Sequence, residues 1–77
     1  MSRAYVLLTV EPGEEDNVLD ELDKIKGVEK SYFSYGVFDI IVKVKSESME
    51  TLKELITSKI RSLNQVRSTL TLIRIEV

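Results

Sequence analysis

The chain has 77 residues, with 13 acidic and 11 basic side chains, a net charge of −2 at pH 7, and neither cysteine nor histidine. A chain of this length forms one small domain whose core supplies only about 3–5 kcal/mol, so natural proteins of this size usually add a disulfide, a metal or a partner subunit. The absence of Cys and His excludes a disulfide framework, a zinc-type site and a thiol or imidazole nucleophile. We therefore expect no metal, no cofactor and no enzymatic activity, and we expect oligomerisation to provide the missing stability.

The charges are unevenly divided along the chain. Residues 1–39 carry 9 acidic and 4 basic side chains, whereas residues 40–77 carry 4 acidic and 7 basic ones. The isoelectric point of about 5.1 is far from that of a small nucleic-acid-binding domain, which typically shows a clustered basic face, so direct nucleic-acid binding is not expected. The apolar segment after Met1 is too short for a secretory signal or a membrane span, which predicts a cytoplasmic protein without membrane contact.

The first half of the chain predicts a strand followed by a helix. Residues 4–11 alternate between two faces, as a strand does, and Pro12-Gly13 ends the run. Three acidic residues then stand where the first turn of a helix exposes its amide groups. Gly27 is the expected left-handed cap at the end of this helix. The expected buried stripe of the helix is Val18, Leu19, Leu22 and Ile25.

The second half predicts two strands, a helix and a last strand. Residues 28–35 and 37–45 read as strands joined by a tight hairpin at Gly36, where glycine reaches the positive φ that such turns commonly require. Ser46 or Ser48 is expected to cap a second helix that ends near Asn64. Residues 65–77 alternate again, with Val66, Ser68, Leu70 and Leu72 on one face and Arg67, Thr69, Thr71, Ile73 and Ile75 on the other.

This β-α-β-β-α-β order is the split βαβ, ferredoxin-like pattern of the α+β class. Right-handed crossovers place both helices on one face of a four-stranded antiparallel sheet and leave the other face open. By alternation the open face is apolar, and it is expected to dimerise sheet to sheet, as in a dimeric α/β barrel. The expected interface residues are Tyr5, Leu7, Ile41, Ile73 and Ile75, and Phe33 projects to the same face.

Asp39 is a carboxylate in an otherwise β-branched strand, so it needs a hydrogen-bonding partner or solvent. Alternation places Thr69 and Thr71 on the same open face, which makes Asp39 and the two threonines a candidate small-ligand site. The alternative interpretation is structural. Asp39 would then accept backbone amides of the Gly36 turn, and the threonines would be ordinary strand residues.

A family resemblance is carried by several segments in order and at fixed spacing. They are Val28 at the start of a strand, Gly36-Val37-Phe38-Asp39 as a glycine-x-x-aspartate hairpin, the run from Ile40 to Val44, and Val66 with Thr69-Leu70-Thr71. On these residues the sequence resembles, over essentially its whole length, the effector-binding (RAM) domain of the Lrp/AsnC leucine-responsive regulators. The resemblance implies dimers that assemble further, and an amino acid bound between dimers near the hairpin, with Gly36, Asp39, Thr69 and Thr71 as the ligand-binding residues.

The sequence starts directly at the first strand, so we expect residues 1–77 to be a single stand-alone RAM domain without the family's helix-turn-helix domain. The expected function is amino-acid sensing and assembly in the regulation of transcription of amino-acid metabolism, alone or with full-length Lrp/AsnC regulators. One alternative is an ACT-like regulatory domain, which would place its ligand near Pro12-Gly13. The other is a small dimeric α+β barrel enzyme, which the absence of His and of converging carboxylates disfavours.

Overall fold

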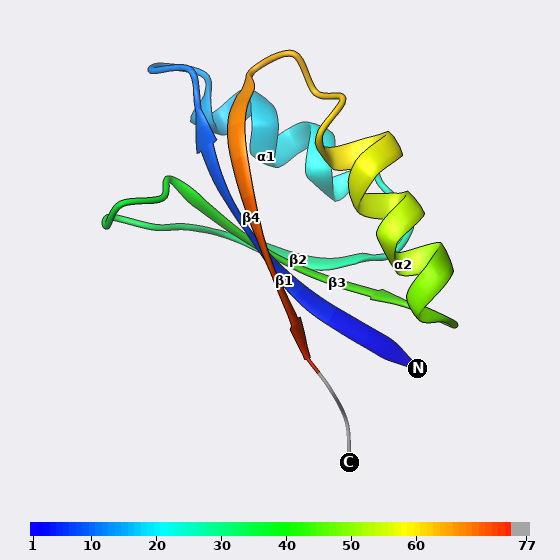
Figure 1. The fold of residues 1–77 in the computed structure, drawn as a ribbon. Coiled ribbons are helices and arrows are strands. Elements are labelled where there is room, and N and C mark those ends of the chain that lie inside the picture. Colours follow the sequence, from blue (N-terminus) through cyan, green and yellow to red (C-terminus); the bar gives the residue numbers. More distant parts are fainter. Residues whose placement is uncertain (75–77) are drawn as a thin grey trace.

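The fold is that of a computed structural model, which describes residues 1–74 and, for Ile73 and Arg74, the backbone alone (Figure 1). The elements in chain order are β1 (Ser2–Val10), α1 (Glu15–Asp23), β2 (Val28–Phe33), β3 (Ile40–Ser46), α2 (Met49–Leu55), the π-helical turn η1 (Ile56–Ile60) and β4 (Val66–Arg74). This order confirms the predicted ferredoxin-like arrangement. The second and third strands are shorter than predicted, because residues 34–39 form a loop.

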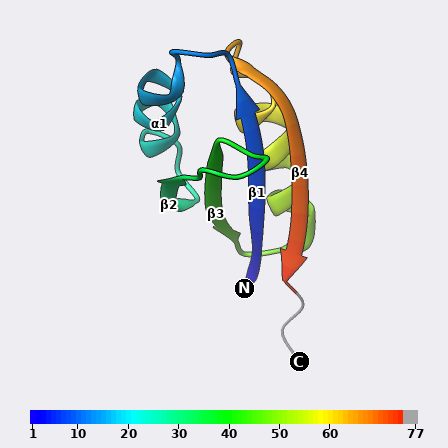
Figure 2. The same cartoon turned by 90° about the vertical axis from the view of Figure 1, so that its left-hand side faces the viewer.

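The four strands form one antiparallel sheet in the order β2-β3-β1-β4, with both helices on the same face (Figures 1 and 2). Alternation along β1 and β3 decides which side chains those helices cover, because successive strand residues point to opposite faces. The buried apolar side chains are Ala4, Val6, Leu8, Val10, Val18, Leu22, Ile40, Val42, Val44, Leu52, Ile56 and Ile60. The core therefore lies entirely between the sheet and the helices.

The second helix begins as predicted and ends differently. Ser48 accepts a hydrogen bond from the Thr51 amide, and the Thr51 hydroxyl in turn lies 3.3 Å from the Ser48 amide, so the two residues form a reciprocal cap. After Leu55 the helix widens into η1, where the Arg61 amide donates to the Ile56 carbonyl, five residues back, at 3.0 Å. The apolar spacing of this segment fits an α-helix and gave no sign of the wider turn.

The predicted faces of β4 were wrong because the strand carries a bulge near its start. Val66 pairs with Val10 on the helix side, but Ser68 already pairs with Thr9 on the open side, which leaves Arg67 as an extra residue. One extra residue exchanges the two faces for the rest of a strand. Thr69 and Thr71 therefore pair with the buried Leu8 and Val6, and the open face instead carries Leu70 and Leu72.

The same kind of bulge changes β2. Val28 pairs with Val44 on the helix side, Glu29 is the extra residue, and Lys30 then pairs with Lys43 on the open side. Tyr32 consequently lies opposite Ile41 on the open face. Phe33, which alternation had placed on that face, lies opposite the buried Ile40 instead.

The glycines also differ from expectation at one position. Gly27 has a φ of +102°, as predicted for a left-handed residue, although it stands in the turn before β2 and the residue capping α1 is Lys24. Gly36 does not have a positive φ, so the prediction of a tight turn that requires glycine there was wrong. The reason is that six loop residues connect β2 and β3, and a longer loop can reverse the chain without a left-handed residue at Gly36.

Substituting each glycine by alanine should give three distinct losses of stability. At Gly27 a Cβ would lie 2.8 Å from Leu55 Cδ2 and the φ is positive, so we expect a loss of at least about 2 kcal/mol. Gly13 has a φ of +85° but open space, which predicts about 1 kcal/mol. Gly36 has neither constraint and should change the free energy of unfolding by less than about 0.5 kcal/mol. Urea denaturation would measure the series, and a Gly36→Ala loss as large as that at Gly27 would contradict it.

Candidate functional site

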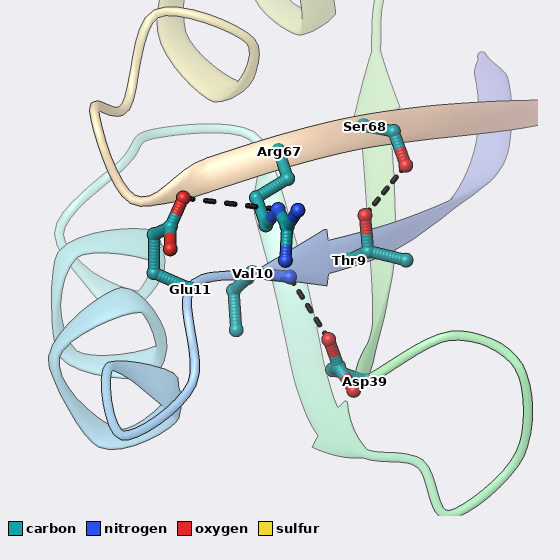
Figure 3. Close-up of polar contacts among 6 residues, drawn as sticks. All are labelled: Thr9, Val10, Glu11, Asp39, Arg67 and Ser68. Atoms are coloured by element: carbon teal, nitrogen blue, oxygen red, sulfur yellow. Dashed lines mark hydrogen bonds and ion pairs between the residues drawn. The ribbon is translucent and has the colours of Figure 1, made fainter.

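Asp39 lies where β3 begins, and it bonds to two neighbouring segments of backbone. Its amide donates to the Leu8 carbonyl at 2.8 Å, and its own carbonyl accepts from the Ser34 amide at 2.8 Å. Its side chain reaches across to β1, where Oδ2 accepts a hydrogen bond from the Val10 amide at 2.9 Å (Figure 3). The carboxylate thus extends the ladder between β3 and β1 by one bond beyond the strand itself. The predicted structural role is present, but its donor is the Val10 amide of β1 and not an amide of the Gly36 turn.

A cleft of about 320 Å³ opens beside this carboxylate. Its wall is formed by Phe33 and Ser34 at the end of β2, by Tyr35 and Asp39 of the loop, and by Glu15 at the start of α1. Glu15 is held in place because its Oε1 accepts the Gly13 amide at 3.0 Å. Phe33 is 46% exposed and Tyr35 is 98% exposed, so two aromatic rings stand beside two carboxylates with little covering either.

Polar contacts on the β4 side fix the ends of the strands around Asp39. The hydroxyls of Thr9 and Ser68 lie 2.5 Å apart, at the position where the bulge shifts the register (Figure 3). Beyond them Arg67, the bulged residue, lies 3.7 Å from Glu11, which follows β1. These contacts hold the end of β1, and with it the Val10 amide, in a defined position.

The structure brings together only part of the predicted ligand site. Asp39 lines the cleft, and Gly36 belongs to the same loop. Thr69 and Thr71 do not line the cleft, because β4 is the edge strand on the opposite side of the sheet from β2. Sequence reasoning missed Glu15, Phe33 and Tyr35. The aromatic residues on both sides of Ser34 were a usable signal, whereas nothing in the sequence placed the start of α1 against this loop.

The open face of the sheet carries apolar side chains as predicted, but some of these residues differ from the predicted ones. Tyr5, Leu7 and Ile41 lie on it. The backbone of Ile73 pairs with Ala4, a helix-side position, which does not fit its predicted place on this face; Ile75 lies outside the described residues. The large apolar and aromatic side chains of this surface, here called the open face, are Tyr5, Leu7, Tyr32, Ile41, Leu70 and Leu72.

Within residues 1–74 no group of three or more His, Cys, Asp or Glu side chains could hold a metal ion. No helix in that range is both long and apolar enough to cross a membrane.

The chain matches a known protein family, a curated protein and several solved structures. The model of the Lrp/AsnC ligand binding domain matches residues 3–77. The regulatory protein AsnC of Escherichia coli K12 is 30% identical over 57 residues, which are 74% of this chain and 38% of AsnC. The chain thus spans well under half the length of that curated relative.

Two solved structures are similar in fold. The hypothetical protein PHS023 of Pyrococcus horikoshii is 34% identical with a TM-score of 0.93, and the match covers 100% of this chain and 93% of PHS023. The transcriptional regulator NMB0573 of Neisseria meningitidis, solved as a complex with L-methionine, has a TM-score of 0.85 at 10% identity. That match covers 97% of this chain and 50% of the regulator, and it shows similarity of fold alone.

The hydrogen bond from Val10 to Asp39 makes a testable contribution to stability. Asp39→Ala leaves the Val10 amide without its acceptor and should lower the free energy of unfolding by about 1–3 kcal/mol. Asp39→Asn keeps an acceptor oxygen and should cost less than about 1 kcal/mol. Both can be measured by urea denaturation at one protein concentration. Equal losses in the two variants would mean that the negative charge matters and the acceptor oxygen does not.

Proposed function

Because the chain belongs to the Lrp/AsnC family of ligand-binding domains, we propose that it binds a small amino-acid effector and assembles through its sheet to take part in the regulation of transcription. The family is one of regulatory ligand-binding domains, which favours a non-enzymatic role over a small barrel enzyme and a RAM domain over an ACT-like one. The observation that carries the proposal is the cleft beside Asp39, which lies at the glycine-x-x-aspartate hairpin.

The chemistry of this cleft suits an ammonium group. Asp39 uses only Oδ2 for the Val10 amide, so its other oxygen is available to a ligand. An ammonium needs an anionic or multiply hydrogen-bonding partner, and a fixed carboxylate provides one with little reorganisation. Glu15 supplies a second carboxylate, while Phe33 and Tyr35 provide aromatic surface for a ligand cation or an apolar side chain. The L-methionine bound by NMB0573 is an effector of the class that we propose here.

The loop that contains Asp39 also offers a surface for a further copy of the chain. Tyr35 and Val37 are 98% and 87% exposed at the tip of the hairpin, which projects away from the sheet and helices (Figure 1). Two exposed apolar side chains on one loop favour burial against another molecule. We propose that a second dimer covers this loop and closes the cleft over the effector. Gly36 lies in the loop between the two exposed residues.

Dimerisation through the open face is the second part of the proposal. Leu70 and Leu72 are 45% and 51% exposed, and they pair with Leu7 and Tyr5 of the adjacent strand β1. The row continues across the sheet from Leu7 to Ile41 of β3 and Tyr32 of β2. A contiguous apolar surface of this kind is larger than a soluble monomer usually exposes. A sheet-to-sheet contact between two copies covers it on both at once, with the same residues facing each other across a two-fold axis.

The role in transcription rests on the relatives. The curated relative is named as a regulatory protein, and this chain matches 38% of its length. We propose that the 77-residue chain acts as the sensing and assembly unit, by itself or together with full-length Lrp/AsnC regulators.

Effector binding predicts a selective thermal shift, and it predicts a loss of affinity when the charge of Asp39 is removed. In a thermal-shift screen against the twenty amino acids, an effector present at 100 times its dissociation constant should stabilise the chain by about 2.7 kcal/mol. With that effector, calorimetry should show at least about tenfold weaker binding to Asp39→Asn and an unchanged assembly state. Asp20→Asn, an exposed change of the same charge on α1 and away from the cleft, is the matched control. Wild-type affinity in Asp39→Asn would assign Asp39 to structure alone.

Assembly through the open face predicts that a charge there separates the subunits. Leu70→Lys places an ammonium in the proposed contact but on an already exposed position, so the monomer should stay folded by circular dichroism while sedimentation shows dissociation. Ser58→Lys adds the same charge on the exposed surface of η1 and should leave the assembly unchanged. A wild-type chain that sediments as a folded monomer at micromolar concentration would end this proposal.

The charge of the chain predicts little affinity for duplex DNA. Phosphate contacts supply most non-specific affinity, and a net charge of −2 offers no strongly basic surface for them. Fluorescence anisotropy with a labelled duplex at physiological salt should show no saturable binding by the 77-residue chain. Tight binding that weakens steeply with salt would contradict the prediction.

A further inference from the structure

A second cleft lies on the helix side of the sheet, at the edge formed by β4. It has a volume of about 230 Å³, and it is separate from the cleft beside Asp39. In Figure 2, α2 and the turn that follows it lie behind β1 and β4. The lining residues are Leu52, Lys53, Ile56, Thr57, Arg61 and Thr71.

The polar lining of this cleft is entirely of the kind that binds anions. Lys53 and Arg61 carry positive charge, Thr57 and Thr71 carry hydroxyls, and no carboxylate lines the cleft. None of these four side chains forms a hydrogen bond or ion pair with another residue of the described part of the chain. Two cations without an ion-pair partner in the described part of the chain therefore line one small cleft that contains no carboxylate.

The π turn explains why these side chains lie together. In a regular α-helix, residues four apart are displaced by about 40° around the axis, so positions 53, 57 and 61 would drift steadily sideways. The i to i+5 hydrogen bond from Arg61 to Ile56 takes more residues into the turn and reverses this drift between Thr57 and Arg61. Lys53 and Arg61 are thereby returned to one side of the helix, and both line the same cleft.

Thr71 completes the site from the opposite wall. The bulge at Arg67 gives Thr71 its helix-side position, where it pairs with the buried Val6 and is itself half-buried. A valine would fill this position equally well in shape, but threonine adds a hydroxyl to a residue that lines the cleft, and this hydroxyl has no partner among the described residues. A hydroxyl can donate to an anion without bringing a charge of its own.

From this arrangement we propose that the cleft between α2, η1 and β4 binds a small oxyanion, phosphate in preference to a carboxylate. The Arg61 guanidinium matches two oxygens at once, Lys53 supplies a point charge, and the hydroxyls of Thr57 and Thr71 donate to the remaining oxygens. Phosphate is preferred because its second negative charge interacts with both cations. The cleft opens on the helix side, so pairing of two copies through the open face leaves it accessible. The proposal stands independently of the amino-acid site.

The test is a titration of the full 77-residue protein with inorganic phosphate, followed by ¹H–¹⁵N NMR at constant ionic strength. Saturable shifts in the millimolar range are expected at the amides of Thr57, Arg61 and Thr71, with chloride as the ionic control. A parallel titration with acetate tests whether the cleft prefers phosphate to a carboxylate. Tighter binding of phosphate supports the proposal as stated, and tighter binding of acetate overturns the preference for phosphate.

Variants separate a built site from diffuse charge. Lys53→Gln and Arg61→Gln should each weaken phosphate binding by at least about threefold. Lys59→Gln removes the same charge from an exposed residue of η1 that does not line the cleft, and it should weaken binding by less than about twofold. Thr71→Val keeps the shape of the side chain and tests the hydroxyl, with Thr69→Val as its control on the same strand.

Three results would overturn the proposal. They are the absence of saturable shifts in these amides, an effect of Lys59→Gln as large as that of Arg61→Gln, and wild-type affinity in both Arg61→Gln and Thr71→Val. Lys53 and Arg61 are exposed, so their variants should unfold at the wild-type urea concentration, which shows that a loss of binding is not a loss of fold.

Discussion

The sheet is covered on one face only, and most other features of the molecule depend on that asymmetry. Every buried apolar side chain lies between the strands and the two helices, and the opposite face keeps its own apolar residues in contact with solvent. The face that a strand residue occupies therefore has a large effect on the free energy of unfolding, because fully burying an aliphatic side chain contributes about 1.5–3 kcal/mol. The same asymmetry separates the proposed functions. The proposed assembly surface is on one face, the proposed oxyanion cleft is on the other, and the cleft at Asp39 lies by the loop at the end of the sheet.

The sequence predicted the element order, the faces of β1 and β3, and a serine cap at Ser46 or Ser48, of which the structure uses Ser48, because each is encoded by local spacing. It failed for β2 and β4 for one shared reason. Each strand opens with an inward valine, Val28 or Val66, and each contains one extra residue, Glu29 or Arg67, that alternation cannot reveal. A bulge becomes visible only once the partner strand is known. For the same reason Thr69 and Thr71 were assigned to the open face, whereas they lie on the helix side.

The sequence predicted Asp39, which lines the candidate site, and missed other residues that line it. Asp39 stands out in the sequence as a charge in a β-branched strand, and the structure gives it a specific partner in the Val10 amide. Glu15 could not be assigned, because its place in the cleft depends on how α1 packs beside the β2–β3 loop, about twenty-four residues further along the chain. Asp39 serves structure and proposed function together, since its Oδ2 bonds to the end of β1 and the residue also lines the cleft.

The strand order has a consequence for how the chain folds. β1 is an inner strand, and its two neighbours are β3 and β4. One edge of β1 therefore stays unpaired until β4, some sixty residues away in the sequence, docks against it. Thr9 of β1 and Ser68 of β4, whose hydroxyls are hydrogen-bonded, are 59 positions apart. Closing so long a loop costs chain entropy before any contact compensates for it, and topologies dominated by such contacts fold slowly. During that interval Leu7 and its neighbours on β1 present an unpaired apolar edge. Docking of β4 is therefore the event that ends the period in which the chain is most exposed to misassociation with other copies of itself.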